Sequence, residues 1–263
     1  MNSVKMDIGK LHPFEGHPFK VQDNEEMDAL VESIQSQGIL TPLIVRKKEN
    51  TTDEYEIISG HRRYRAAMKA GLETVPAFIY ALDRNAAAIM LVDCNLHRER
   101  LLPSEKAFAY KMKLDAMKRQ GVRTDLTSSP VATKFDAAIK LGKEYGESRD
   151  QVFRYIRLTY LIPEILEMVD NSVLKEKDKL QIALRPAVEL SYLTEQEQYD
   201  LHETMMTEDR TPSHAQAIKM RKFSQDGRLN MDVIFSIMQE EKGNQKEQFK
   251  IPRDRISKYF APG

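Results

Sequence analysis

The chain has 263 residues, of which 41% are hydrophobic and 30% charged, and its 40 basic and 40 acidic side chains cancel to zero formal charge. This length accommodates two or three units with hydrophobic cores, while the charge balance excludes a uniformly basic protein that coats nucleic acid. No apolar run approaches the roughly 20 residues of a membrane span, no signal region is present, and the sequence has one cysteine. The sequence therefore predicts a cytoplasmic protein without a membrane segment.

Charge is unevenly distributed along the chain. Residues 101–157 carry 12 basic and 7 acidic side chains, a net of +5, whereas residues 1–100 have a net of −2 and residues 158–263 a net of −3. A basic middle block is typical of a face that binds a polyanion, if folding gathers its side chains on one side. A solvated helical surface would give the same count, so charge alone leaves both interpretations open.

The first 100 residues predict a small mixed α/β unit. Apolar residues at three- and four-residue spacing from Met27 to Ile34 predict a helix that ends at Gly38. Runs rich in β-branched and aromatic residues predict strands over 43–45, 55–58 and 75–80. A further helix is predicted over 62–70, between the second and third of these strands.

From residue 85 onward strand signals nearly vanish and helical patterns follow one another. The predicted helices cover 86–92, 102–119, 135–145, 149–161, 163–169, 179–193, 195–206 and 231–241. A polar loop is predicted over 124–129, and a linker rich in Lys, Gln and Glu over 242–248. The pattern predicts an α+β chain with a mixed domain at 1–100, an all-α domain at 101–225, and a tail or the start of a further domain at 226–263.

A glycine turn joins the second predicted strand to the helix that follows, in the segment SGHRRYR at 59–65. Glycine lets the backbone approach a ligand, a helix N-terminus presents unpaired N–H groups, and arginines add bidentate donors for phosphate. Arg62, Arg63 and Arg65 oppose the helix dipole unless an anion compensates them. The pattern favours a polyphosphate site over its alternative, a charged and solvated first turn.

The segment DCNLHRE at 93–99 is the next candidate, between two predicted helices. Asn95 is an oxygen ligand suited to Mg²⁺, and Arg98, three residues later, is another phosphate donor. A turn between helices, capped by Asp93 or Asn95, explains the same residues without a ligand.

Three segments, taken in order, resemble successive motifs of the ParB family of partition proteins. They are QGILTPLIVR at 37–46, GHRRYRA at 60–66 and NLHRERL at 95–101, and the resemblance extends over about residues 5–220. It implies a ParB/sulfiredoxin-like N-terminal domain that binds CTP with Mg²⁺. It also implies a dimer that closes around DNA as a clamp after it recognises its site.

The resemblance assigns nucleotide binding to residues of all three motifs. They are Gly38, Thr41, Pro42, Gly60, His61, Arg62, Arg63, Arg65, Asn95 and Arg98, and Asn95 is also the implied magnesium ligand. Two positions depart from the family, which commonly has Glu where this chain has His61 and Cys94. Because a neutral thiol cannot replace the charge of a carboxylate beside the metal ligand, nucleotide binding is better supported than hydrolysis, and weak CTP hydrolysis stays open.

Residues 137–158, AAIKLGKEYGESRDQVFRYIRL, have the outline of a helix-turn-helix. Gly146 permits the turn, Ser148 caps the second helix, and Val152 and Ile156 face the core. Six residues are assigned to DNA binding: Ser148, Arg149, Gln151, Arg154, Tyr155 and Arg157. The side chains of all of them except Ser148 are expected to point outward. Any helix pair with a glycine turn has a similar outline; its place after the nucleotide motifs, within the basic block, favours the DNA-reading interpretation.

These features predict a site-specific DNA-binding protein of the ParB type, associated with the nucleoid. CTP would couple recognition of a palindromic double-stranded site to closure of a homodimer, in the partition of a plasmid, mobile element or chromosome. The sequence leaves open whether a ParA-type ATPase is a partner. Two alternatives stay open: a transcription or nucleoid-occlusion regulator on the same scaffold and, from another class, a nucleotide-dependent phosphotransferase. The sequence leaves open the DNA site, and it does not show the dimerisation domain with which many family members end.

Overall fold

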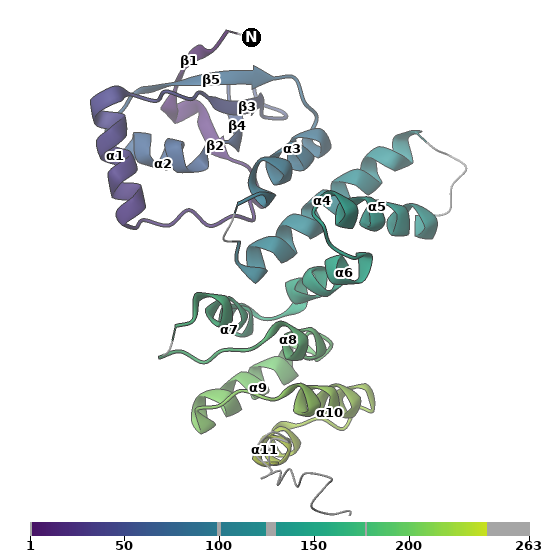
Figure 1. The fold of residues 1–263 in the computed structure, drawn as a ribbon. Helices are drawn as coiled ribbons and strands as arrows, with labels where there is room; N and C mark the ends of the chain where they lie inside the picture. The colour runs from purple at the N-terminus through teal and green to yellow at the C-terminus, as the bar shows by residue number, and fades with distance from the viewer. Residues whose placement is uncertain (1, 99–100, 125–129, 177, 241–263) are drawn as a thin grey trace, which may run out of the picture.

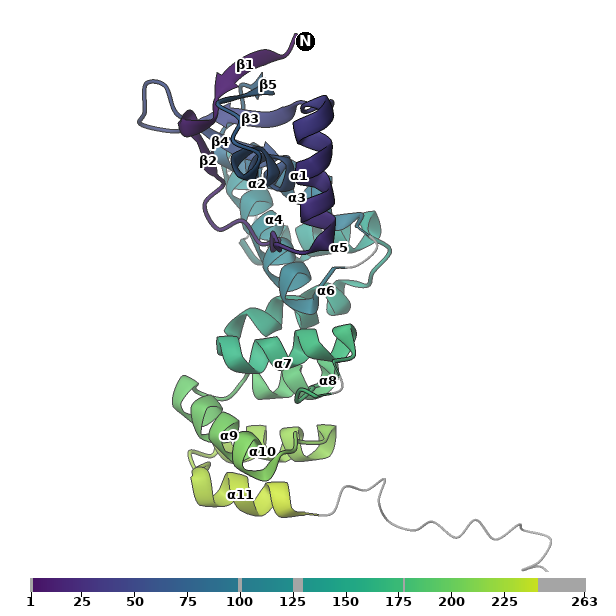
Figure 2. The same cartoon turned by 90° about the vertical axis from the view of Figure 1, so that its left-hand side faces the viewer.

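A mixed sheet with flanking helices opens the chain, and a succession of helices continues away from it in one direction (Figures 1 and 2). The structure is a computed structural model that describes residues 2–98, 101–124, 130–176 and 178–240, without the side chains of 121–124 and 130–135. No helix in these ranges is both long enough and apolar enough to cross a membrane.

The sheet unit contains five strands and three α-helices among the described residues. In chain order its elements are β1 (Val4–Asp7), the 3₁₀ turn η1 (Ile8–Lys10), β2 (Leu11–Pro13), α1 (Glu25–Gln37), β3 (Leu43–Lys47), β4 (Tyr55–Ser59), α2 (His61–Lys69), β5 (Thr74–Tyr80) and α3 (Arg84–Leu96). The helices that follow are α4 (Pro103–Thr124), α5 (Pro130–Glu144), α6 (Arg149–Arg157), η2 (Leu158–Tyr160), α7 (Pro163–Leu174), α8 (Leu184–Leu190), α9 (Glu195–Glu208), α10 (His214–Gln225) and α11 (Met231–Gln239). The predicted α+β class is therefore confirmed.

The sheet is curled, and its connections show why. Its strand order is β1-β5-β3-β4-β2, so the first two strands of the chain occupy opposite edges. Only Ile8–Lys10 joins them. Four steps of about 3.8 Å reach about 15 Å, whereas a flat five-stranded sheet separates its edges by about 19 Å. The two edges must therefore bend toward each other.

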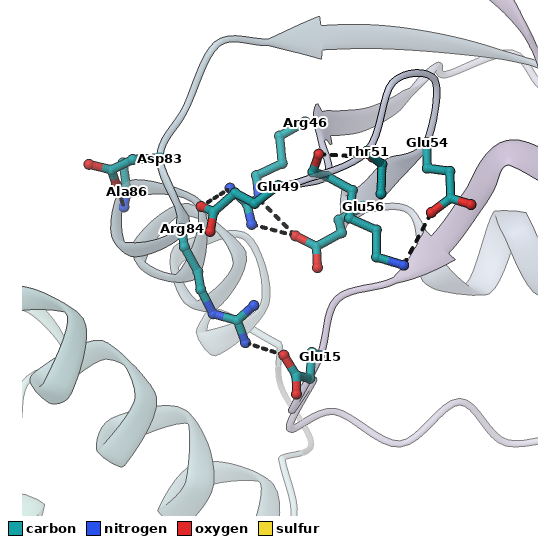
Figure 3. A network of polar contacts seen from close by, with 10 residues as sticks. Glu15, Arg46, Glu49, Thr51, Glu54, Glu56, Asp83, Arg84 and Ala86 are labelled. Atoms are coloured by element: carbon teal, nitrogen blue, oxygen red, sulfur yellow. Dashed lines mark hydrogen bonds and ion pairs between the residues drawn. The ribbon is translucent and has the colours of Figure 1, made fainter.

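A buried ion pair fixes β3 against β4. Arg46 and Glu56 lie directly opposite each other on the two strands, and the guanidinium of Arg46 lies 2.6 Å from the Glu56 carboxylate. Figure 3 shows this contact. Both side chains are almost completely buried. Glu49 adds a second carboxylate at 3.0 Å from Arg46. Because a buried charge is tolerated only when it is paired, this contact holds the β3–β4 register.

One hydrophobic core runs from the sheet unit into the first helices beyond it. Ile58 of β4 and Leu91 and Val92 of α3 are buried in the same cluster as Tyr110 of α4 and Leu141 of α5. A second core lies among α7 to α11, with members such as Ile165, Leu190, Leu201, Met220 and Ile237. The predicted boundary near residue 100 thus falls between two helices that share a core, and the division into domains stays a prediction.

Most predicted elements are confirmed, and several helix bounds differ from the prediction. The helix predicted over 163–169 runs on to Leu174, and the one predicted over 149–161 ends at Arg157, before the turn η2. The helix predicted over 86–92 extends over Arg84–Leu96, because Asp83 caps its start and no glycine or proline interrupts it. The helix predicted over 179–193 is only Leu184–Leu190, because Ala183 is extended and Pro186, which lacks an N–H, fits only in a first turn.

Three elements were missed, and two predicted segments cannot be compared with the structure. The missed elements are the edge strands β1 and β2 and the helix α10. The loop predicted over 124–129 and the linker over 242–248 lie outside the described residues, apart from Thr124 at the end of α4.

Candidate functional site

The start of α2 has no side-chain cap and carries no acidic residue in its first turn. Gly60, in the left-handed conformation with φ +105°, links β4 to α2, and glycine offers no side chain to cap the helix. A Cβ placed on Gly60 would lie 3.0 Å from Cγ of Leu43 and 3.3 Å from the guanidinium carbon of Arg63. Position 60 is therefore restricted to glycine, and the first N–H groups of α2 are available to an anion.

The three arginines of this motif have different surroundings. Arg63 is half-buried and donates to the carbonyl oxygens of Thr41 and Pro42, 2.9 Å from the latter. Burial also lowers its pKa. Arg62 is partly exposed, with Glu26 of α1 at 3.1 Å. Arg65 binds Asp23 at 2.8 Å. Arg63 thus orders the 41–42 segment beside the helix start, and Arg65 is engaged by the residues that precede α1.

Two stacked histidines lie at the same helix start. The rings of His61, the first residue of α2, and His17, between β2 and α1, have centroids 3.7 Å apart. Burial lowers the pKa of His61 to about 3 and that of His17 to about 4, and Arg98 contributes to both shifts. His17 was missed by the sequence analysis, because no local pattern marks a histidine that pairs with a residue so distant in the chain.

The end of α3 reaches this helix start. The side chain of Arg98 is exposed, yet desolvation of its guanidinium lowers its pKa; the nearby Arg62 lowers the pKa further and Glu105 opposes the shift. Its guanidinium lies 5.6 Å from the centre of the Phe19 ring. Arg98 is therefore close enough to α2 for its charge to act on Arg62 and on both histidines.

Asn95 and Cys94 lie within α3 and not in a turn between helices, which corrects the alternative interpretation of their segment. Asn95 is buried and its side-chain amide donates to the carbonyl of Leu91 at 2.7 Å, which leaves Oδ1 as its ligand atom. Cys94 is exposed, and although a hydrogen bond to Ser59 opposes the effect, burial of part of the side chain raises its pKa. Within the described ranges no three His, Cys, Asp or Glu side chains are placed to share a metal ion.

The structure thus brings together most of the residues assigned to the nucleotide. Those gathered around the start of α2 are Thr41, Pro42, Gly60, His61, Arg62, Arg63 and Arg98. Gly38 instead ends α1, with φ +71°, and Arg65 is engaged by Asp23. The binding role of each residue stays a prediction.

Helices α5 and α6 are joined by a tight turn, in the segment where the sequence predicts a helix-turn-helix. Ser148 caps α6 by accepting a hydrogen bond from the N–H of Gln151 at 3.1 Å. The turn closes tightly on α5, since a Cβ on Gly142 would lie 2.5 Å from the carbonyl oxygen of Glu147. Gly146 lies in the left-handed conformation within the turn. Gly142 is thus a second glycine that the turn requires, and the sequence analysis had singled out only Gly146.

The side chains of α6 divide into outward and inward groups. Arg149 and Arg154 are exposed and Gln151 is half-exposed, as expected, and Arg149 pairs with Asp150 at 2.8 Å. Tyr155 was expected to point outward, but it packs into both hydrophobic cores, where its ring lies 5.9 Å from that of Tyr110.

Arg157 also differs from the expectation that it points outward. Its Nε donates to Ser191 at 3.0 Å, and its guanidinium stacks 3.9 Å from the centre of the Tyr192 ring. The cause is the packing of the α8 end against α6, which a helical pattern in α6 alone does not reveal.

One buried lysine joins α3 to the turn before α6. Lys113 of α4 is almost fully buried, donates to Asp93 of α3, and lies 2.8 Å from the Glu144 carboxylate at the end of α5. The Tyr145 hydroxyl donates to the same Asp93 at 2.7 Å. Asp93 lies two residues before Asn95, so this network connects the residues just before the third motif to the end of α5 and the turn that leads into α6.

A comparison with known protein families identifies the sheet unit. Residues 1–96 match the model of the ParB N-terminal domain. The sheet unit is a ParB N-terminal domain, and the chain is similar to ParB proteins. The three motif segments identified in the sequence lie within this match or directly beyond its end.

Curated relatives of this ParB-like protein extend the match into the helical region. A nucleoid occlusion protein of Listeria innocua is 28% identical over 88% of this chain and 78% of its own length. The chromosome-partitioning protein Spo0J of Thermus thermophilus is 36% identical over 64% of this chain and 55% of its own length. The match thus spans about half the length of the Spo0J relative.

A solved structure is also similar to the ParB-like chain. It is the C-terminally truncated chromosome-partitioning protein ParB from Caulobacter crescentus in complex with CTP-γ-S. The two are 25% identical, the likeness covers 78% of this chain and 99% of that one, and the TM-score is 0.35.

Proposed function

We propose that this ParB-like protein binds DNA site-specifically in chromosome or plasmid partition, and that CTP controls the binding. The observation that carries the proposal is the start of α2, where Arg62, Arg63 and Arg98 surround an uncapped helix N-terminus. Backbone N–H groups, a helix dipole and guanidinium donors together suit the phosphates of a nucleotide. The motifs shared with the ParB family support CTP as that nucleotide.

Magnesium would enter this site with the nucleotide. The described residues near the end of α3 offer one neutral oxygen ligand, Oδ1 of Asn95, while Asp93 is engaged by Lys113. Mg²⁺ usually retains several waters and binds through substrate phosphates and one or two protein ligands, so Asn95 fits as its single protein ligand. When bound, the ion would neutralise phosphate charge, and the proposal concerns binding without a hydrolytic step.

DNA reading is assigned to α6. Arg149, Gln151 and Arg154 lie on its outer side, and side chains of these types make bidentate contacts to guanine and adenine in the major groove. A homodimer would place two such helices in successive grooves, so the proposed site is palindromic. The names of the Spo0J and nucleoid occlusion relatives support a role on the chromosome. A cytoplasmic location and a ParA-type ATPase as a candidate partner are further parts of this proposal.

The first test is equilibrium binding of CTP, ATP, GTP and UTP to the full chain with Mg²⁺, with and without genomic DNA fragments. Selective CTP binding is expected. Absence of binding under every condition would overturn the nucleotide part and leave a DNA binder without a nucleotide switch. Turnover of a nucleotide with a small acceptor in the absence of DNA would instead support the phosphotransferase alternative.

A nucleoid-occlusion or transcription regulator is the second candidate function. It is favoured by the longer match to the nucleoid occlusion protein, which covers 88% of this chain against 64% for Spo0J. Mapping of genomic binding sites in cells separates the two functions. A few sites clustered near one locus would support partition, whereas many dispersed sites, or sites at promoters, would support regulation.

A further inference from the structure

The stacked pair of His17 and His61 has two buried ring nitrogens without a hydrogen-bond partner, although His17 also has a hydrogen bond with the backbone of Phe19. Nε2 of each ring is shielded from water and has no partner among the described residues. His61 is more than nine-tenths buried. A buried polar atom without a partner costs free energy, so such an atom at a candidate site indicates a group that is supplied by a ligand.

The charges that face this pair are positive. Arg98, from the segment after α3, lowers the pKa of both histidines, and Arg62 follows His61 directly in α2. The backbone of Phe19 has the opposite effect on His17, and Glu105 of α4 acts on Arg98. Without an anion, two uncharged imidazoles beside two arginines are the lowest-energy arrangement. A bound polyanion would reverse that preference.

We propose that His17 and His61 bind the phosphates of the nucleotide through their Nε2 atoms, each as a donor that takes up a proton on binding. This inference rests on the proposed function and adds His17, from the segment between β2 and α1, to the site. Phosphate oxygens would give the unpartnered Nε2 atoms a hydrogen-bond partner, and the protonated rings would offset phosphate charge next to the start of α2. The nucleotide would then bind together with protons.

The pH dependence of CTP affinity tests this proposal. Proton uptake makes binding tighter as the pH falls, by up to about tenfold per pH unit for each proton taken up. CTP affinity should be measured by calorimetry at several values between pH 6.5 and 8.5, in two buffers of different ionisation enthalpy, to count the protons. The comparison is between the wild-type chain and the variants His17→Gln and His61→Gln, which retain an N–H donor but cannot become charged.

His214→Gln is the matched control. His214 is also the first residue of a helix, α10, but it is exposed and follows a complete capping box at Ser213. The two site variants should bind CTP with a flatter pH dependence and fewer protons taken up, while the control behaves as wild type. Because protonation of CTP itself is common to all four proteins, identical pH profiles would overturn the proposal. If wild type itself fails to bind CTP, the proposed function fails instead.

Imidazole signals provide a readout that needs no variant. Inorganic tripolyphosphate carries the phosphates without base or ribose, and NMR follows the Cε1–H signals of the six histidines. Tripolyphosphate should move the signals of His17 and His61 toward their protonated positions and leave that of His214 in place. Signals that respond to CTP but not to tripolyphosphate would place the imidazoles against the base, and signals that respond to neither would remove them from the site.

Discussion

The N-termini of α2 and α6 differ in how their unpaired backbone N–H groups are satisfied. Both helices follow a left-handed glycine, Gly60 or Gly146, and both carry arginines in their first turns. In α6, Ser148 caps the helix and Asp150 lies in the first turn, so the chain itself satisfies the N-terminus. In α2 neither a capping side chain nor an acidic residue is present. The backbone N–H groups at the start of α2 are therefore available to a ligand, whereas only the side chains of α6 are available for binding.

Acid should destabilise the packing around α2 more than α6 itself, whose residues Arg149–Arg157 include no histidine. The folded-state pKa values of His17 and His61, about 4 and about 3, lie below the ordinary 6.5. Between the folded-state values and pH 6.5, the unfolded chain binds more protons than the folded chain does. The free energy of unfolding therefore decreases as the pH falls below 6.5. From pH 7.5 to pH 5 the expected loss is about 2 kcal/mol per histidine, at most about 4 for the stacked pair.

Urea unfolding at the two pH values, for wild type and the double variant His17→Gln and His61→Gln, measures this loss. Other groups titrate in the same range, so the difference between the two proteins isolates the pair. An equal loss in both would show that the histidines are not buried and neutral in the folded chain.

The variant Arg62→Ala should reduce CTP affinity while leaving DNA-site affinity near the wild-type value. Removal of a charge-assisted donor to phosphate costs about 2 to 3 kcal/mol, or roughly 30- to 150-fold in affinity. Lys69→Ala is the matched control, because Lys69 is a basic residue at the other end of α2, pairs with Asp23 and is not assigned to the nucleotide. A similar loss in both variants would mean that general charge, not the site, attracts the nucleotide.

The variant Gly60→Ala should destabilise the chain more than Gly71→Ala does. Both glycines have positive φ, so both substitutions carry a backbone cost of about 1 to 2 kcal/mol. Only the Cβ at position 60 meets neighbours, whereas that at position 71 has none within 4 Å. Thermal unfolding should show an additional loss of about 1 kcal/mol for Gly60→Ala. Equal losses would contradict the tight approach of Leu43 and Arg63.

The variant Arg154→Ala should weaken binding to the cognate site by about 1 to 2 kcal/mol and leave CTP affinity unchanged. Arg228→Ala is the control, since Arg228 is also exposed but lies between α10 and α11, far along the chain of helices (Figure 2). Fluorescence anisotropy with labelled duplex DNA measures both. If the two variants lose equal affinity, α6 is not the element that reads the site.

The variant Ser148→Ala should have the smallest effect, about 1 kcal/mol of stability, because it removes only the cap of α6. Ser148→Thr, which retains the hydroxyl, should recover most of this loss in urea unfolding. An unchanged free energy of unfolding in Ser148→Ala would show that the start of α6, like that of α2, does not depend on a side-chain cap.

Local patterns predicted the elements of both helix starts, and long-range contacts decided what the sequence analysis missed. The strand, glycine and helix around Gly60 follow from residues that are neighbours in sequence. The pairing of His17 with His61 depends on the curl of the sheet and leaves no local signal. Tyr155 lies three residues after the buried Val152, on the same side of the helix, so helical spacing could have predicted its inward position. The inward position of Arg157 depends on Ser191 and Tyr192, which no pattern in α6 contains.

The exposed Cys94 gives the chain a built-in attachment point for a fluorescent reporter. It is the single cysteine of the sequence, and its thiol hydrogen-bonds to Ser59, the residue directly before Gly60. A maleimide dye can therefore be placed beside the start of α2 without any substitution, and the raised thiol pKa calls for labelling at mildly alkaline pH. Emission from that dye would follow ligand arrival in real time on the native sequence.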